Sequence, residues 1–130
     1  MDQEQHLLAD CRRIGDILAR IGDKWTIMVL TALGDDRRRF GELHRAIDGI
    51  SQRMLTVTLR HLEQDGIVTR TVYPTIPPRV EYQLSERGRS LKQALTPIGR
   101  WVVANRDDIE QSRTDFEAML DRVEAASGPE

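Results

Sequence analysis

Residues 50–66 read ISQRMLTVTLRHLEQDG, and this stretch decides the fold. Three leucines recur at the i, i+4, i+7 spacing that places side chains on one helix face: Leu55, Leu59 and Leu62. Ser51 stands where a side-chain oxygen can cap the first turn, and Gly66 stands where a left-handed residue ends the last turn. The stretch therefore predicts an amphipathic helix from Ser51 to Asp65 with one buried side.

The side of this helix opposite the leucines is the candidate DNA-reading surface. Its residues are Gln52, Arg53, Thr56, Val57 and Arg60. Gln can pair with adenine, Arg with guanine, and the methyl groups of Thr and Val can contact the thymine methyl. The hydroxyl of Ser51 and the first N–H groups of the helix suit a phosphate. An ordinary solvated helix face has a similar composition, so the flanking segments decide between the two interpretations.

The flanking segments favour DNA. A brief predicted helix over Gly41–Ile47 and a glycine turn at 48–50 come before the reading helix, which is the order of a helix-turn-helix. After it, Val68–Tyr73 and Val80–Leu84 show the alternation and β-branched enrichment of two strands. The connection 74–79 contains three prolines, which cannot continue a ladder, so it forms a stiff hairpin tip. A helix-turn-helix followed by such a hairpin is a winged helix.

Two further basic segments are candidates for backbone contacts. Arg79 leaves the hairpin tip with Thr75 across from it, and a wing arginine can enter the minor groove or hold flanking phosphates. The alternative is a solvated turn residue. Residues 37–40 form a possible edge strand that begins with three arginines. Of these we include Arg39 as a phosphate contact, which positions the protein without specifying sequence; a solvated edge is the alternative.

The remaining segments predict helices on both sides of this unit. A helix over 6–22 comes first, and Asp23 caps a second helix over Lys24–Leu33. Residues 85–125 return to helix, where Pro97 either kinks one helix or starts another. We therefore predict an α+β fold, mainly α, with a single domain over residues 1–130 and the winged helix at 23–84.

Charge is unevenly distributed along the chain. The formal net charge of the 130 residues is −2. Residues 37–89 nevertheless contain ten arginines and six acidic residues, a balance of +4, whereas residues 105–130 contain three arginines and eight acidic residues, a balance of −5. Arginine binds phosphate and guanine through two parallel hydrogen bonds. The distribution therefore favours double-stranded DNA as the partner of the middle segment.

Several classes of protein are not expected. No apolar run approaches the ~20 residues of a membrane span, and the polar, acidic start lacks signal-peptide character. With the single cysteine Cys11, this places the chain in the cytoplasm without an intramolecular disulfide. His6, His44 and His61 fall in three different elements and lack metal-ligand spacing. We accordingly expect no enzyme activity, no metal and no cofactor.

Five segments carry a resemblance to a known family: Ile21–Thr26, Arg39–Leu43, Ile50–Leu55, Leu59–Glu63 and Val80–Ser85. In this order they resemble the HxlR-type family, a branch of the MarR-like winged-helix regulators. The resemblance implies a dimeric bacterial transcription regulator whose reading helix carries Ser51, Gln52, Arg53, Thr56 and Arg60. It also implies that the first and last helices form the dimer interface. There we expect Leu7, Ile14, Leu18, Ile98, Trp101, Val102 and Phe116.

The signal that controls such a regulator stays open at this stage. Many members carry a cysteine at the start of the first helix, and in some it senses electrophiles or oxidants. Cys11 matches that position, although Arg12 follows it where many members have proline. Neighbouring arginines lower a thiol pKa, but Cys11 also lies on an apolar stripe and can act as a small hydrophobe.

Two alternatives to an oxidant-responsive DNA-binding protein remain. One is a ligand-responsive regulator in which Cys11 is structural and a small apolar molecule is the effector. Trp25, Met28 and Trp101 would then line a pocket, although their helical spacing favours the core. The other is a winged-helix adaptor that binds protein instead of DNA.

Overall fold

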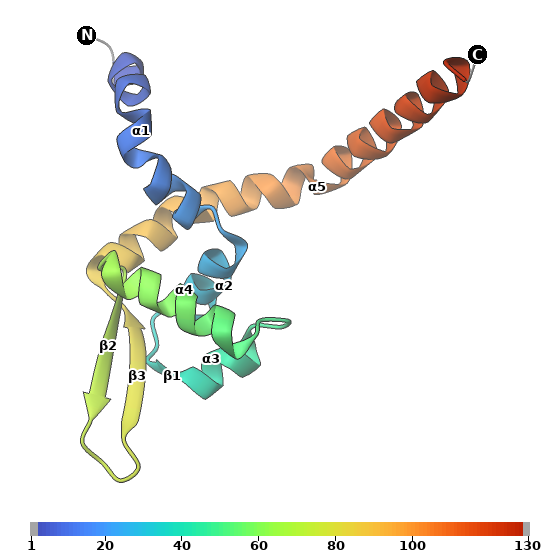
Figure 1. The fold of residues 1–130 in the computed structure, drawn as a ribbon. Coiled ribbons are helices and arrows are strands. Elements are labelled where there is room, and N and C mark those ends of the chain that lie inside the picture. Colours follow the sequence, from blue (N-terminus) through green and yellow to red (C-terminus); the bar gives the residue numbers. More distant parts are fainter. Residues whose placement is uncertain (1–2, 129–130) are drawn as a thin grey trace. The chain divides into compact units, whose positions relative to one another are not determined.

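The structure, a computed structural model, describes residues 3–128 and leaves the side chains of residues 6–9 and 11–13 undescribed. The predictions for the side chains of Leu7 and Cys11 therefore lie outside the described residues. The elements in chain order are α1 (Gln3–Ile21), α2 (Lys24–Leu33), β1 (Arg38–Arg39), α3 (Phe40–Ala46), α4 (Gln52–Gln64), β2 (Val68–Tyr73), β3 (Arg79–Leu84) and α5 (Glu86–Ala126) (Figure 1). The contacts divide into two units, up to Lys92 and from Gln93 onward.

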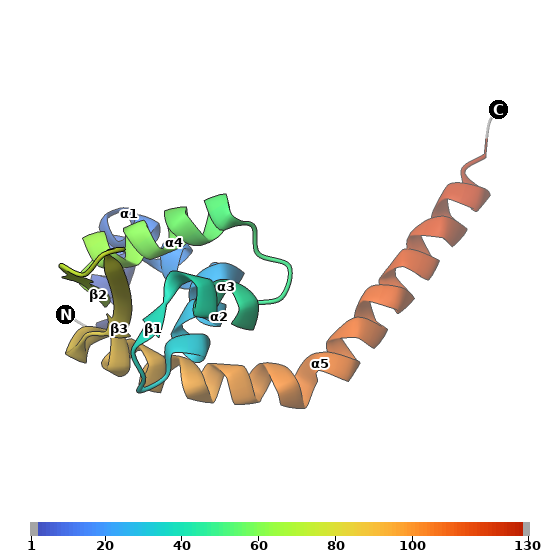
Figure 2. The same cartoon turned by 90° about the horizontal axis from the view of Figure 1, so that it is seen from below.

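The first unit has the predicted mainly helical α+β architecture. Its three strands form an antiparallel sheet in the order β1-β3-β2, and Figure 2 shows β1 beside β3. Tyr82 of β3 pairs with Arg38 of β1 on one side and with Arg70 of β2 on the other. The prediction of a winged helix-turn-helix is confirmed.

Local sequence signals start and end the helices as expected. Asp23 accepts hydrogen bonds from the backbone N–H groups of Trp25 at 2.9 Å and Thr26 at 3.4 Å, which satisfies free donors of α2. Ser51 does the same for α4, where its hydroxyl accepts from the Met54 N–H at 3.0 Å. Beyond the end of α4, Gly66 has a φ of +70°, a conformation that glycine adopts without steric cost.

The core of the first unit lies where α4 packs against α2 and the base of the hairpin. All three leucines of the predicted stripe are at most 2% exposed. Contacts join α4 to α2 and to β2, so the buried side of the helix has partners on two elements. The other buried apolar side chains are Val29, Leu30, Leu33, Leu43, Ile47, Ile50, Ile67, Val68 and Leu84. This packing fixes which side of α4 faces solvent.

The carboxyl end of α4 is held by charged contacts as well. Nη1 of Arg20 on α1 donates to both carboxylate oxygens of Asp65, at 2.9 and 3.0 Å. Arg87 on α5 donates to the backbone carbonyl of Asp65 at 2.9 Å. The end of α4 is thus tied to α1 and to the start of α5.

Some expectations differ from the structure. The final segment is a single helix, α5, with Pro97 inside it, so no second helix begins there. Met28 and Trp101 are 43% and 60% exposed, so the interpretation of these side chains as core is wrong for the single chain. The division of one domain into an N-terminal helix, a winged helix and a C-terminal region stays a prediction. Among residues 3–128, no helix combines the length and apolar character needed to span a bilayer.

Candidate nucleic-acid interface

The outward side of α4 is a continuous exposed surface. Because the leucines face inward, all five predicted reading residues, Gln52, Arg53, Thr56, Val57 and Arg60, are exposed. Within the part of the chain that the structure describes, neither Arg53 nor Arg60 forms an ion pair. Both guanidinium groups therefore keep their full set of donors for an external acceptor.

The hydrogen bonds inside α4 define what each remaining side chain can offer. The Thr56 hydroxyl donates to the Gln52 carbonyl at 2.8 Å, so toward a ligand it presents lone pairs and a methyl group. Ser51 uses an acceptor position to cap Met54, which leaves its own O–H free to donate. Ser51 is itself exposed and lies at the positive end of the helix dipole.

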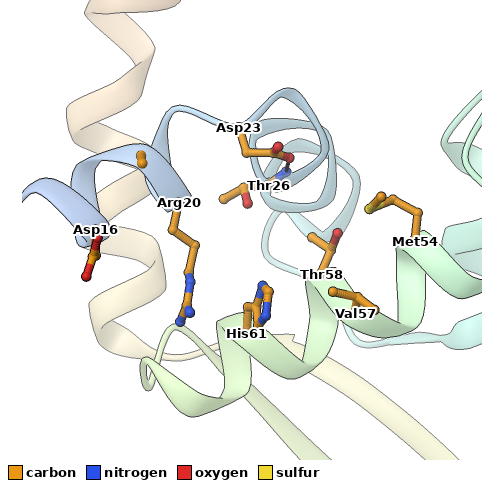
Figure 3. A pocket seen from close by; sticks show the side chains of 9 residues that line it. Asp16, Arg20, Asp23, Thr26, Met54, Val57, Thr58 and His61 are labelled. Atoms are coloured by element: carbon orange, nitrogen blue, oxygen red, sulfur yellow. Dashed lines mark hydrogen bonds between the residues drawn. The ribbon is translucent and has the colours of Figure 1, made fainter.

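One edge of this surface borders a hollow between α1, α2 and α4 (Figure 3). Its volume is about 540 Å³, and Met54, Val57, Thr58 and His61 line it from α4. Arg20, which also lines the hollow, extends from α1 toward the end of α4. Sequence periodicity did not reveal this hollow, because it depends on where α1 lies relative to α4.

The structure corrects the position of Arg79 on the wing. Arg79 is the first residue of β3 and pairs with Tyr73 in the sheet register, so the prediction that Thr75 lies across from it is wrong. Its guanidinium carbon lies 4.5 Å from the centre of the Tyr73 ring, and its Nε lies 3.5 Å from a Glu81 carboxylate oxygen. The side chain is 40% exposed, so Arg79 is partly available but stacked at the base of the tip.

Arg37, which lies outside the hairpin, also stabilises the part of the hairpin next to its tip. Nη1 of Arg37 donates to the Tyr73 hydroxyl at 2.8 Å, and its Nε donates to Gln83 Oε1 at 3.0 Å. Tyr73 thus lies between two arginines, one on its hydroxyl and one on its ring face. Sequence reasoning treated Arg37 only as part of a charge run; no local signal identifies a partner 36 residues away.

Three predicted backbone contacts come together in a second hollow. Arg39, Thr75 and Arg79 all line a space of about 490 Å³ between the wing and the start of α3. The Thr75 hydroxyl donates to the Pro77 carbonyl at 2.8 Å, so it holds the tip conformation. Two arginines line this hollow, and the Nε of one of them, Arg79, lies 3.5 Å from a Glu81 carboxylate oxygen. The exposed residues of α4 do not line it.

The predicted dimer residues that are described are exposed or only partly buried in their own units. In the first unit, Ile14 is partly buried and Leu18 is 53% exposed. In the second unit the exposed fractions lie between 47% and 60% for the predicted set: Ile98, Trp101, Val102 and Phe116. Exposed apolar side chains in such number on helices mark surfaces that become covered.

Comparison with known proteins decides the family. The model of the HxlR-like helix-turn-helix family matches residues 20–110, which include the turn, α4 and the whole wing. The chain belongs to this family. It is therefore a transcriptional regulator of the helix-turn-helix type, as the sequence resemblance implies.

Individual members support this assignment. An uncharacterized HTH-type transcriptional regulator of Methanothermobacter thermautotrophicus is 51% identical over 81 residues, which are 62% of this chain and 62%, less than two thirds, of that protein. The uncharacterized HTH-type regulator YybR of Bacillus subtilis is 44% identical over 73% of this chain and 76% of its own length. Among solved structures, the redox regulator HypR in its reduced form is 42% identical, with a TM-score of 0.69 over 76% of this chain and 98% of HypR.

Proposed function

We propose that this HxlR-like regulator binds double-stranded DNA sequence-specifically, with α4 in the major groove. The observation that carries the proposal is the pair of exposed, unpaired arginines, Arg53 and Arg60, on a helix whose opposite side is anchored in the core. A major-groove helix needs a rigid backing and free donors at base-edge distance. Gln52, Thr56 and Val57 complete the reading surface.

The other predicted contacts hold the DNA backbone. Ser51 and the first N–H groups of α4 suit a phosphate at the groove edge, because the helix dipole and free donors point there. Arg39 and Arg79 line the hollow beside the wing and suit a second backbone position, while Thr75, whose hydroxyl donates to the Pro77 carbonyl, holds the tip beside them. Contacts of this kind fix orientation, while the side chains of α4 select sequence.

We further propose that the protein acts as a homodimer on a pseudo-palindromic operator. The exposed apolar side chains of α1 and α5 support this, because a second copy would remove them from water. A two-fold axis would then place two copies of α4 about 34 Å apart, one turn of DNA. We expect the dimer interface to include Ile14 and Leu18 in the first unit, and Trp101 and its neighbours in the second.

A selection and a salt titration test the DNA-binding proposal. A duplex of about 30 base pairs, long enough for two half-sites one turn apart, is selected from a random pool with the purified protein. We expect its binding constant to fall steeply and linearly with salt on logarithmic axes, because neutralised phosphates release counterions. Sedimentation should give two chains per duplex. A protein-binding adaptor would instead select no duplex, or bind with a flat salt dependence.

Similarity to HypR favours oxidant control as the signal. That relative is a redox regulator by name, and here Arg12 and Arg13 follow Cys11 on α1. Adjacent cations favour the thiolate, which is the nucleophile in oxidation. We propose that peroxide converts the Cys11 thiol to a sulfenic acid and is itself reduced to water. The change would occur on the helix assigned to the dimer interface.

Replacing Cys11 with serine tests this assignment. Hydrogen peroxide should weaken binding of the selected duplex by the wild type, and thiol reductant should restore it; Cys11→Ser should bind equally with and without peroxide. The two proteins are compared by fluorescence anisotropy at one salt concentration. An equal peroxide response in both would remove Cys11 from control and favour a small-molecule effector.

A further inference from the structure

The wing tip carries a fully exposed apolar side chain. Ile76 has a relative exposure of 101%, so its whole side chain stands in water, beyond Arg79. An isoleucine side chain left fully in water forgoes the favourable transfer of its apolar area into a covered site. A polar residue would suit this exposed position equally well. The apolar side chain therefore indicates a partner that covers it.

Prolines and hydrogen bonds restrict the tip that presents Ile76. Pro74, Pro77 and Pro78 restrict the backbone around it. The Thr75 hydroxyl donates to the Pro77 carbonyl at 2.8 Å, and the Thr75 N–H donates to the Tyr73 carbonyl at 2.8 Å. Below them, Tyr73 lies between Arg37 and Arg79. A preformed tip loses little conformational entropy on binding.

The surroundings of Ile76 indicate that the partner is a polyanion. The same tip residues line the hollow of about 490 Å³ that contains Arg39 and Arg79. An apolar protein partner would not need two arginines beside the contact. The DNA minor groove offers an apolar surface at the edges of the stacked bases and phosphates along both sides. Isoleucine is among the side chains that wedge between base steps there.

We propose that Ile76 is an apolar wedge that enters the minor groove beside each half-site while Arg39 and Arg79 hold the adjacent phosphates. This inference rests on the proposed function and adds a distinct contact to it. The wing would then partly unstack one base step and bend the duplex. Pyrimidine–purine steps unstack most easily, so the operator should favour a TA or CA/TG step at that position without a hydrogen bond to the bases.

Three variants separate the wedge from general effects of the wing. Ile76→Ala removes the wedge, and Ile76→Leu keeps its apolar bulk. Val72→Ala is the matched control, because Val72 is a 51% exposed aliphatic side chain on β2, below the tip. Each protein binds the selected duplex carrying 2-aminopurine at one position outside the half-sites. This base analogue becomes brighter when it loses stacking, and it is moved along the flank one base pair at a time.

For the wild type, Ile76→Leu and Val72→Ala, we expect a fluorescence rise at one flanking step. For Ile76→Ala we expect no rise, about tenfold weaker binding and a smaller bend in gels of circularly permuted fragments. If Ile76→Ala brightened the same step, or if wild type bound the duplex with no bright step, the wedge would be overturned while the proposed function stood. If wild type selected no duplex at all, both would fail.

Discussion

Replacing Gly88 with alanine is expected to destabilise the first unit by about 3 kcal/mol. Gly88 is a buried helical residue near the start of α5. A Cβ built there would fall well inside contact distance of the Ile67 carbonyl oxygen and 3.2 Å from Leu84 Cδ2. The Ile67 carbonyl is held in place, because the backbone N–H of Ser85 donates to it at 2.9 Å and the Ser85 hydroxyl is shared between it, at 3.0 Å, and the Gly66 carbonyl, at 2.6 Å. The added methyl group must therefore displace α5 or the turn that precedes β2.

Urea denaturation of both proteins at the same protein concentration measures the effect. Gly41→Ala is the control, since its Cβ would meet only the flexible end of the Arg45 side chain, at 3.4 Å. Gly41 is helical and exposed, so this change should be neutral or stabilise by up to about 1 kcal/mol through helix propensity. Equal stability of Gly88→Ala and the wild type would show that α5 does not pack as closely on Ile67, in the turn before β2, as the structure places it.

The difference between Gly88 and the leucines of α4 shows what a sequence can reveal about this fold. The leucines can be recognised in the sequence because the buried side of a helix repeats at a fixed spacing. Ser51 and Asp23 indicate helix starts, because residues of these types cap the first turn through local hydrogen bonds. Both signals arise within a few residues. Gly88 is required by the carbonyl of Ile67, in the turn before β2 and about twenty residues earlier in the chain. The helical pattern around a glycine does not indicate which distant backbone group lies against it.

The wing illustrates the same limit at the site. Composition and alternation predicted both strands and the proline tip, but the pairing partner of Arg79 depends on the register, which those patterns leave free by a residue or two. The register places Arg79 opposite Tyr73, so the arginine stacks on the tyrosine ring at the base of the tip. The tip beyond this pair carries the fully exposed Ile76.

The reading surface was predictable for the opposite reason. Once Leu55 is buried, helix geometry alone places Arg53 and Thr56 on other sides, and both are exposed. Which base each side chain meets depends on a second molecule and on a second copy of the chain. The pairing of side chains with bases is set by contacts between molecules, and the periodicity of one chain carries no information about those contacts.

Arg53→Ala is expected to lower affinity for the selected duplex about thirtyfold, equivalent to about 2 kcal/mol, and to relax preference at one base pair. Arg53 lies in the first turn of α4, is exposed, and forms no ion pair among the described residues. Its removal breaks nothing inside the protein, so the loss should appear in binding and leave the urea midpoint unchanged. Anisotropy titrations with the selected duplex and with each single-base variant measure both effects.

A matched loss of charge separates base reading from attraction to phosphate. Arg106→Ala removes the same charge from the acidic C-terminal segment, where Arg106 is 66% exposed, so it should change affinity only slightly and change no base preference. A base-reading arginine loses most of its contribution on scrambled duplex, because the guanine that it pairs with is absent there. Arg53→Ala should therefore weaken the selected duplex far more than the scrambled one. Equal weakening of both would mean that Arg53 contacts only the backbone, and sequence selection would then have to come from Gln52, Thr56 and Arg60.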